Sequence, residues 1–384
     1  MNDLIRIPCV LMRGGTSRGP FFLASDLPQT PAARDAVLLS VMGSGHHLEI
    51  DGIGGGNALT SKVAIVGPSR RPGADVDYLF AQVKVLEQAV DTSPNCGNML
   101  AAVGPFAIEA GVVPVQDGIT TLRIHNVNTG KVIESRIQTP GGRVLYDGSV
   151  AISGVPGTAA PITLTFLDSA GSKTGALLPT GAARNTFDGV EVTCLDAAMP
   201  VVILRAADLG KTGHETPAEL NADAGFLRRL ESIRIQAGEA MGIPNVRDRV
   251  IPKPVLIAPA APGQDGDSLT TRYFMPHECH SALAITGGVA LANACATPGT
   301  LAAEMTAVSA FPADLTFAHA TGRLQVTIDH PPGAPAPVVS VIRTARRLFE
   351  GAVFAKPAVW AHAPERAAPG QTTENTAPLL RTMP

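Results

Sequence analysis

Cys96 has a setting that suits proton transfer. It lies in the stretch SPNCGNML, residues 93–100, where Ser, Pro and Asn favour a turn, and the apolar run that follows up to Gly111 predicts a buried helix of about four turns. The free N–H groups and the positive dipole end at a helix start favour a thiolate, and they can also hold a carboxylate. The same residues fit a cysteine packed as a small apolar side chain, so the stretch alone leaves both interpretations open.

Lys62 is the second candidate for acid–base chemistry. It follows the glycine-rich loop DGIGGGN, residues 51–57, and starts the apolar run KVAIV, which predicts a strand. The glycines allow close backbone approach, but the loop lacks the lysine spacing of a P-loop, and no helix follows it as in a dinucleotide-binding turn. Lys62 is therefore either a solvated strand end or a partly desolvated amine, and desolvation would favour the neutral form that acts as a base.

A third group of polar residues lies between predicted strands at residues 5–12 and 21–23. The connecting sequence RGGTSRG predicts a hairpin loop. Its donors are Arg13, Thr16, Ser17 and Arg18. Two guanidinium groups and two hydroxyls around accessible backbone suit a carboxylate or a phosphate, and a solvated hairpin tip explains the same residues equally well.

The composition excludes several classes of partner. With 384 residues, a net charge of −3 and 16% charged residues, the chain lacks the basic surface of a nucleic-acid-binding or membrane-surface protein. It has no run of 18 apolar residues and no leader pattern, so we expect a cytoplasmic protein. Its five cysteines are scattered without a CxxC pair, and His277 and His280 have no third ligand beside them, so we expect no disulfide framework and no metal site.

The chain reads as two similar halves. Its 39 glycines and 32 prolines favour many short strands, and a second, almost wholly apolar helix is predicted at residues 280–294. A helix that is apolar on all sides has to be enclosed, so we expect each half to be a curved sheet rolled around its central helix. The predicted fold is α+β with two pseudo-symmetric domains, residues 1–183 and 184–363, and a mobile tail at 364–384.

Several motifs, spread over nearly the whole chain, point to one known family. They are PCVLMRGGTSRG at residues 8–19, DGIGGG at 51–56, TSK at 60–62, NCGN at 95–98, FAIEAG at 106–111, DGVEVT at 188–193, TG at 286–287 and RTARRL at 343–348. This set resembles the PrpF-like family of the diaminopimelate-epimerase superfamily, and within it the 4-oxalomesaconate tautomerases most of all. The resemblance implies two barrel-like domains, each around a helix, with the active site between them.

The resemblance also implies which residues react. Lys62 and Cys96 match the lysine and cysteine that form the functional pair of the PrpF-like family. Cofactor-free epimerases of this fold use one cysteine at each central helix start, but the second position falls here at or beside Ala284. Their Asn-Pro substrate contact is replaced by Met199 and Pro200. We therefore expect no two-thiol racemisation, and the resemblance implies no metal and no organic cofactor.

The expected reaction is a 1,3-proton shift in an unsaturated keto-polycarboxylate such as 4-oxalomesaconate, in aromatic-acid catabolism. This is an allylic isomerisation or a keto–enol tautomerisation. Lys62 would remove the proton, and Cys96 would return one or only orient the substrate. Further residues would bind the substrate and stabilise the enolate. These are Arg13, Thr16, Ser17, Arg18, Asn57, Ser61, Asn95, Gly97, Asn98, Arg272, His280, Ser281, Thr286 and Gly287.

Two alternatives stay open at this point. A methylaconitate or aconitate isomerase would use the same lysine and cysteine, and motifs shared across the family do not separate it from a tautomerase. A non-catalytic carboxylate-binding protein would bind its ligand without exchanging ligand hydrogen with solvent. The expected partner in each case is a small di- or tricarboxylate, with no nucleic acid and no membrane, and a homodimer is left open as the assembly.

Overall fold

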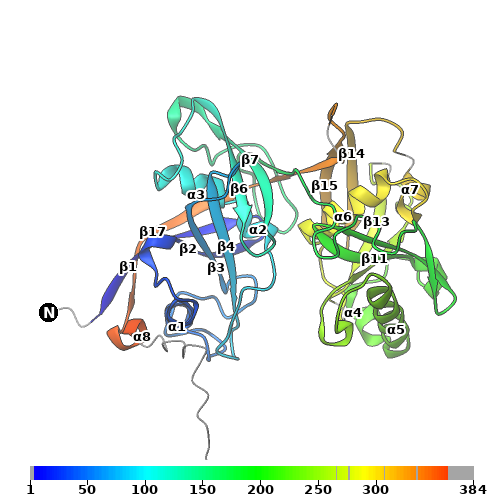
Figure 1. Cartoon of the computed structure of the whole chain (residues 1–384), viewed down its shortest axis with the longest axis horizontal. Helices are drawn as coiled ribbons and strands as arrows, with labels where there is room; N and C mark the ends of the chain where they lie inside the picture. The colour runs from blue at the N-terminus through cyan, green and yellow to red at the C-terminus, as the bar shows by residue number, and fades with distance from the viewer. Residues whose placement is uncertain (1–3, 265, 276, 307, 334–335, 362–384) are drawn as a thin grey trace, which may run out of the picture.

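The computed structural model describes residues 4–264, 266–275, 277–306, 308–333 and 336–361, and the tail predicted at 364–384 lies outside them. Figure 1 shows two lobes side by side, the first built mainly from the N-terminal half of the chain and the second mainly from the later half. In the part of the chain that is described, no helix combines the length and the apolar character needed to cross a membrane.

The described strands form one continuous, strongly curved sheet. Those of the first lobe are β1 (Ile5–Gly14), β2 (Ser17–Leu23), β3 (Lys62–Pro68), β4 (Val76–Val83), β5 (Val90–Asp91), β6 (Gly118–Asn126), β7 (Lys131–Thr139) and β8 (Ile162–Phe166). Those that follow are β9 (Asn185–Phe187), β10 (Val190–Ala197), β11 (Met199–Arg205), β12 (Lys253–Ala258), β13 (Leu269–Tyr273), β14 (Ala313–His319), β15 (Gly322–Asp329), β16 (Val338–Arg343) and β17 (Ala345–Ala355). The pairing of β8 with β16 joins the two lobes.

The two lobes repeat one pairing pattern. From β1 through β2, β3, β4, β6 and β7 to β8, neighbours pair antiparallel, parallel, antiparallel, parallel, antiparallel and antiparallel. The same succession of pairings runs from β10 through β11, β12, β13, β14 and β15 to β16. β3 and β12 therefore hold equivalent places, and the predicted α+β fold with two pseudo-symmetric halves is present.

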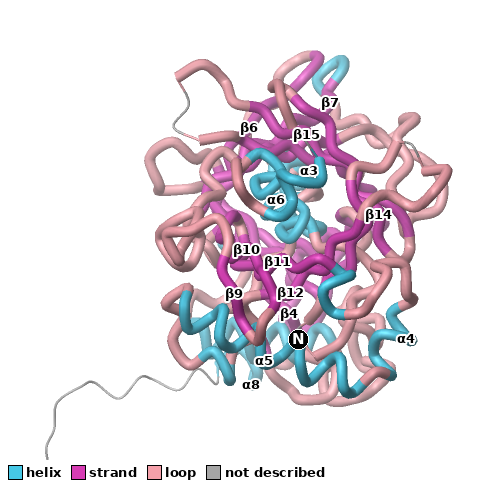
Figure 2. Tube along the Cα trace, turned by 90° about the vertical axis from the view of Figure 1, so that its right-hand side faces the viewer, coloured by secondary structure: helices cyan, strands magenta, loops and turns pink. Residues whose placement is uncertain are grey.

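Each lobe encloses a central helical segment. The described helices are α1 (Pro31–Met42), α2 (Gly97–Leu100), α3 (Val103–Glu109), α4 (Pro217–Ala222), α5 (Ala224–Ala240), α6 (Ile285–Ala296), α7 (Leu301–Thr306) and α8 (Pro357–Ala361). α2, α3 and α6 share one apolar core with the inward side chains of the strands, and Figure 2 shows α6 surrounded by strands. α1 packs on the outer face of the first lobe's sheet, and α5 packs on that of the second.

The central helix of the first lobe is shorter than predicted. Instead of about four continuous turns from Cys96 to Gly111, the segment forms two pieces, α2 and α3. Pro105 lacks an N–H and cannot bond to the carbonyl of Ala101, which interrupts the helical ladder. Gly111, with a φ of 71°, ends the segment as predicted. The dipole at Cys96 therefore comes from a four-residue helix and is weaker than the predicted helix would supply.

The second central helix begins later than predicted. It starts at Ile285 rather than at His280, and Ala284 is its N-cap residue. Nδ1 of His280 accepts the N–H of Ala282 at 2.9 Å, which holds the preceding residues in a turn. The residues before α6 are thus fixed by a side chain rather than by helical hydrogen bonds.

The last strand returns to the first lobe. β17 lies within the predicted second domain, yet it pairs with β1 from Ile5–Ala355 to Gly14–Ala345. Figure 1 shows this orange strand beside β1. The division at residues 183 and 184 stays a prediction, and the pairing shows that β17 belongs with the first sheet.

Candidate active site

Lys62 opens β3 and faces the inside of the first lobe. It pairs with Gln82 of β4, and the next pair on this face is Ala64 with Phe80, both of which lie in the core around α2. Since side chains alternate along a strand, Lys62 lies on the same face as these residues. Its Nζ donates to Oε1 of Gln82 at 2.8 Å and lies 5.1 Å from the centre of the Phe80 ring.

Cys96 is the N-cap residue of α2 and is 9% exposed. The Tyr78 hydroxyl donates to its carbonyl at 3.3 Å. Burial, followed by the charge of Cys96, raises the pKa of Tyr78 well above its ordinary value, so Tyr78 stays a phenol at neutral pH. Tyr78, Phe80 and Gln82 alternate along one face of β4 and so link Lys62 to Cys96. The sequence interpretation missed Tyr78 and Gln82, although their period-two spacing in VDYLFAQV was a readable signal.

The starts of the two central helices meet. A methyl group added to Gly97, the first residue of α2, would lie 3.0 Å from Cβ of Ile285, the first residue of α6. Cys96 and Ala284 are the respective N-cap residues, so the two positions are equivalent and only one of them carries a thiol. Cys279 lies in the separate core around α5, where burial raises the pKa of its thiol to about 11. Cys279 therefore does not replace the missing second cysteine.

The tip of the β1–β2 hairpin reaches the start of α2. Nδ2 of Asn98 donates to Oγ1 of Thr16 at 3.0 Å, and the N–H of Gly15 donates to the carbonyl of Thr344 at 2.9 Å. Ser17 is 3% exposed, and its Oγ has no hydrogen-bond partner among the described residues. A buried hydroxyl without a partner is a group that a ligand can satisfy. The structure thus brings together the predicted residues Thr16, Ser17 and Asn98.

Arg13 and Arg18 lie on the other face of the sheet. They pair with each other across β1 and β2, and Arg13 also pairs with Arg346 of β17. Their neighbours on this face, Cys9 and Phe22, pack with the α1 side of the sheet. Together with Thr16 and Ser17 of the hairpin tip, the three arginines line a hollow of about 590 Å³. Alternation along β1 and β2 puts Arg13 and Arg18 on the face opposite Lys62, but they share this hollow with Thr16 and Ser17, so their contact with substrate stays a prediction.

Arg272 also points away from the central helices. It lies on β13 between Thr271 and Tyr273, and Tyr273 packs in the core around α6. The Arg272 Nε donates to the carbonyl of Glu215, just before α4, at 2.6 Å, and Nη1 of the same guanidinium donates to the carbonyl of Thr271 at 2.8 Å. Two backbone carbonyls therefore hold Arg272 on the outer face, and the predicted substrate contact is not supported.

Three more side chains that were predicted to contact substrate form hydrogen bonds within the protein instead. Oδ1 of Asn57 accepts the N–H of Leu59 at 2.8 Å, and Oγ of Ser61 donates to the buried Glu49 at 2.5 Å. Oδ1 of Asn95 accepts from Asn126 at 2.6 Å. These side chains hold the loops that carry Lys62 and Cys96, so positioning explains their polar character.

The remaining predicted residues surround the start of α6. His280 and Ser281 precede the helix, and Thr286 and Gly287 lie in its first turn. The carbonyl of Ser281 accepts the Thr321 hydroxyl at 2.9 Å. The first intrahelical bond reaches Ala284 from Gly288, so the three amides before Gly288 precede the helical ladder, as at any helix start.

Arg343 and His319 face the same interior, and the sequence interpretation missed both. Val339 and Val341 of β16 lie in the core around the central helices, so alternation puts Arg343 on that face. By the same rule His319 follows Phe317 inward on β14. Burial, then the positive charges of Arg343, His280 and Arg272, lowers the pKa of His319 to about 4. The alternation of side chains along VVSVIR, the sequence of β16, could have indicated that Arg343 faces inward.

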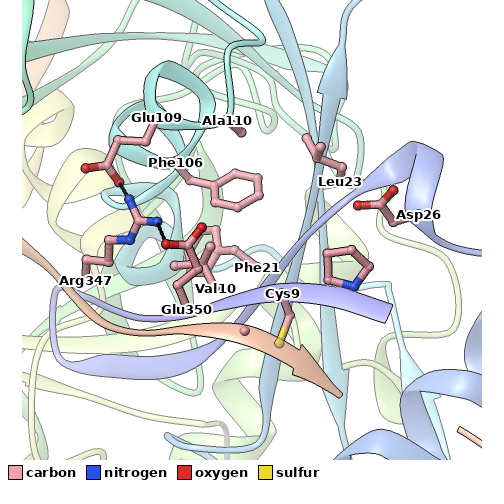
Figure 3. Close-up of a pocket in the computed structure, with 12 residues that line it drawn as sticks. Cys9, Val10, Phe21, Leu23, Asp26, Phe106, Glu109, Ala110, Arg347 and Glu350 are labelled. Atoms are coloured by element: carbon pink, nitrogen blue, oxygen red, sulfur yellow. Dashed lines mark hydrogen bonds and ion pairs between the residues drawn. The ribbon is translucent and has the colours of Figure 1, made fainter. Parts of the chain in front are cut away.

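A smaller hollow of about 150 Å³ lies beside β1 and α3 in the first lobe (Figure 3). Its one arginine, Arg347, bonds to Glu109 at 2.8 Å and to Glu350 at 2.5 Å. The hydroxyl of Tyr146 also donates to Glu109, at 2.9 Å. Because the guanidinium charge of Arg347 is already matched by two carboxylates, this hollow does not favour an anionic ligand.

Residues 4–356 match the family described as PrpF protein. The chain belongs to the PrpF family. It is 56% identical to a putative isomerase, YbhH, of Escherichia coli K12, with 91% of this chain and 99% of that protein covered. It is 47% identical to the 4-oxalomesaconate tautomerase of Pseudomonas putida KT2440, with 91% of this chain and 96% of that protein covered.

The fold of this PrpF-family chain has a close match among solved structures. A methylitaconate-delta-isomerase superimposes with a TM-score of 0.85 and 34% identity, covering 96% of this chain and 100% of that one. The family and the fold class predicted from the sequence are therefore confirmed. The relatives are named as isomerases or a tautomerase, in agreement with the predicted class of enzyme.

Proposed function

We propose that this PrpF-family protein is a cofactor-independent isomerase that moves a proton across three atoms of an unsaturated keto-polycarboxylate, with 4-oxalomesaconate as its substrate. The similarity to a 4-oxalomesaconate tautomerase over nearly the full length of both chains supports the substrate. The observation that carries the residue assignment is on β4, where Gln82 and Phe80 contact Lys62 while Tyr78, on the same face, contacts Cys96. β4 thus contacts the Lys62 amine and the backbone of Cys96, and the Cys96 side chain packs in the same core as Tyr78 and Phe80, which supports a shared site.

Lys62 is the base in this proposal. As a free amine it removes the acidic proton next to the conjugated system, and the electron pair spreads into an extended enolate. A proton then returns at the other allylic carbon, or at oxygen for a keto–enol change. Positioned acid–base groups commonly contribute about 10²–10⁴-fold to a rate. Cys96, beside the start of α2, either donates the returning proton or orients the substrate.

Arg343 supplies the positive charge that the substrate needs. Its guanidinium donates to the carbonyl of Ile342 at 2.8 Å, and among the described residues no carboxylate forms an ion pair with it. Burial lowers the pKa of Arg343 to about 10, so it stays charged at neutral pH. Arg343 is half-buried, and a guanidinium in such a place without a counterion can bind a substrate carboxylate through two parallel hydrogen bonds.

A second candidate is an isomerase of methylitaconate or methylaconitate. The TM-score of 0.85 to a methylitaconate-delta-isomerase favours it, because a chain of the same fold is named for that dicarboxylate. The proposed roles of Lys62 and Cys96 are the same in both reactions, so turnover of each acid decides between them. A cytoplasmic location and a homodimer remain predictions.

The decisive experiment replaces Lys62 with Met and follows the ultraviolet absorbance of 4-oxalomesaconate. We expect a loss of at least about 10²-fold in kcat, because the base is gone. Lys84→Met is the matched control, since Lys84 is exposed just after β4. A Lys62→Met rate within about threefold of wild type would remove Lys62 from the role of base. Proton NMR in D₂O with each candidate acid would show which substrate turns over and which carbon exchanges.

A further inference from the structure

Lys253 holds the place in the second lobe that Lys62 holds in the first. Lys62 is the first residue of β3, and Lys253 is the first residue of β12. Each of these strands pairs parallel with the long strand before it and antiparallel with the strand after it. The two strands are thus equivalent in the repeated pairing pattern, and each begins with a lysine followed by apolar residues, KVAIV and KPVLI.

Lys253 also faces the interior of its lobe. Val255 and Ile257 of β12 pack in the core that encloses α6, whereas Leu256 and Ala258 pack on the α5 side. Alternation along the strand therefore directs Lys253 toward the α6 face. The same argument directed Lys62 toward the α2 face, so the two lysines have equivalent orientations as well as equivalent positions.

The Lys253 side chain is largely buried, and its amine has no partner among the described residues. It is 4% exposed, and among the described residues the structure gives its Nζ no hydrogen bond and no ion pair. Burial, followed by the charge of Arg234, lowers the pKa of Lys253 to about 8. An amine that gains and loses a proton close to neutral pH is suited to acid–base catalysis. A lysine needed only for solubility would lie in solvent, and one needed only for packing would be paired.

We propose that Lys253 is the second proton-transfer group of the reaction, returning a proton to the far carbon of the allylic system from the side opposite Lys62. α2 and α6 begin in contact with each other, where Gly97 meets Ile285, so a substrate bound beside this contact would face both lobes. The inference rests on the proposed function and deepens it, because it assigns proton return to an amine and leaves Cys96 to orient the substrate.

The two half-reactions balance without a co-reactant. Lys62 takes the proton as a free amine, the C–H bond breaks, and its electron pair enters the conjugated system. The Lys253 ammonium gives its proton to the far carbon, so a new C–H bond forms and the double bond moves by one position. Lys62 is left as an ammonium and Lys253 as an amine. Proton exchange with water restores both groups.

The test separates the two proton transfers in D₂O by proton NMR, with the full-length protein. In Lys253→Met we expect isomerisation to fall by about 10²–10⁴-fold while the substrate C–H still exchanges with solvent, because Lys62 continues to remove and return that proton. Lys62→Met should lose exchange and isomerisation together. Lys253→Arg keeps a cation at this position but is a poor proton donor, so it should behave like Lys253→Met. Lys84→Met, on the surface, is the control.

Each result of this experiment either supports or overturns the role proposed for Lys253. A Lys253→Met enzyme that isomerises within about threefold of wild type overturns the proposal. A second result would also overturn it. If Lys253→Arg has the thermal midpoint of wild type but loses both hydrogen exchange and isomerisation, Lys253 is needed before the second proton transfer. If the wild-type protein neither exchanges nor isomerises any candidate acid, the proposed function fails. If wild type isomerises and only the exchange pattern disagrees, the Lys253 inference fails alone.

Discussion

Gly97 of α2 lies so close to Ile285 of α6 that a methyl group at residue 97 would make a contact tighter than ordinary packing. An added Cβ at residue 97 would lie 3.0 Å from Cβ of Ile285 and 3.1 Å from its Cδ1 and Cγ2. The backbone at Gly97 is helical, so space rather than conformation requires glycine there. The contact fixes how closely the two helix starts approach, and therefore how closely the two lobes approach the substrate.

We expect Gly97→Ala to reduce kcat/KM by up to about 10-fold, because the added methyl shifts Ile285 or α2 by a few tenths of an ångström and a shift of about 1 Å can cost about 100-fold. Overpacking of this kind costs about 1–3 kcal/mol of unfolding free energy, so the variant should fold. Steady-state kinetics and urea unfolding would measure both effects. Gly225→Ala at the start of α5 is the control, since its added methyl meets its nearest atom at 3.4 Å. A Gly97→Ala enzyme with wild-type kcat/KM would show that the contact does not position the site.

Gln82→Glu should move the activity to higher pH. Oε1 of Gln82 lies 2.8 Å from Nζ of Lys62, so a carboxylate there would form an ion pair that stabilises the ammonium over the free amine. If Lys62 must lose its proton to act as a base, the acidic limb of the kcat/KM profile should rise by about one pH unit or more. Gln82→Met removes the acceptor without adding charge and should leave the limb where it is. If the acidic limb of the kcat/KM profile of Gln82→Glu lies at the same pH as in wild type, the protonation of Lys62 does not determine that limb.

Arg343→Met should raise KM more than it lowers stability. Loss of a charge-assisted hydrogen bond costs about 1.5–3 kcal/mol, so we expect an increase in KM of about 10- to 100-fold. The thermal midpoint should change little, because Arg343 is half-buried and has no ion-pair partner among the described residues. Arg136→Met is the control, since Arg136 is exposed on β7 of the same sheet. A lower thermal midpoint with an unchanged KM would assign Arg343 a structural role instead.

The sequence predicted what depends on local pattern. The strand that begins at Lys62 and the turn that presents Cys96 follow from neighbouring residues, whereas the equivalence of Cys96 with Ala284 came from the family resemblance, and both residues are helix N-caps. The break between α2 and α3 was also readable, since Pro105 removes a donor from the helical ladder. The family motifs then supplied the pairing of an amine and a thiol that lie far apart in the chain.

The sequence did not indicate which face of the sheet the arginine side chains lie on. β1 is covered on both faces, by α1 on one side and by α2 and α3 on the other, so its apolar residues run almost without interruption and do not reveal a face. Arg13 therefore looked equally suited to either side. The equivalence of Lys62 and Lys253 depends on strand pairing over most of the chain, and Arg343 comes close to the hairpin tip only because Thr344 bonds to Gly15.

His319 should make the protein less stable as the pH falls. Burial is the main reason that the pKa of His319 is about 4 in the folded protein, against an ordinary value of 6.5, and Arg343, His280 and Arg272 add to it. Between pH 6.5 and pH 4 the unfolded chain takes up a proton at this residue that the folded protein does not, so unfolding becomes more favourable as pH falls through that window. Above pH 6.5 the imidazole is neutral in both states and contributes no pH dependence. His319→Gln should therefore lose less unfolding free energy than wild type between pH 7 and pH 5, measured by urea unfolding at both values. Since the carboxylates titrate alike in the two proteins, equal losses would show that the folded protein protonates His319 as readily as the unfolded chain does.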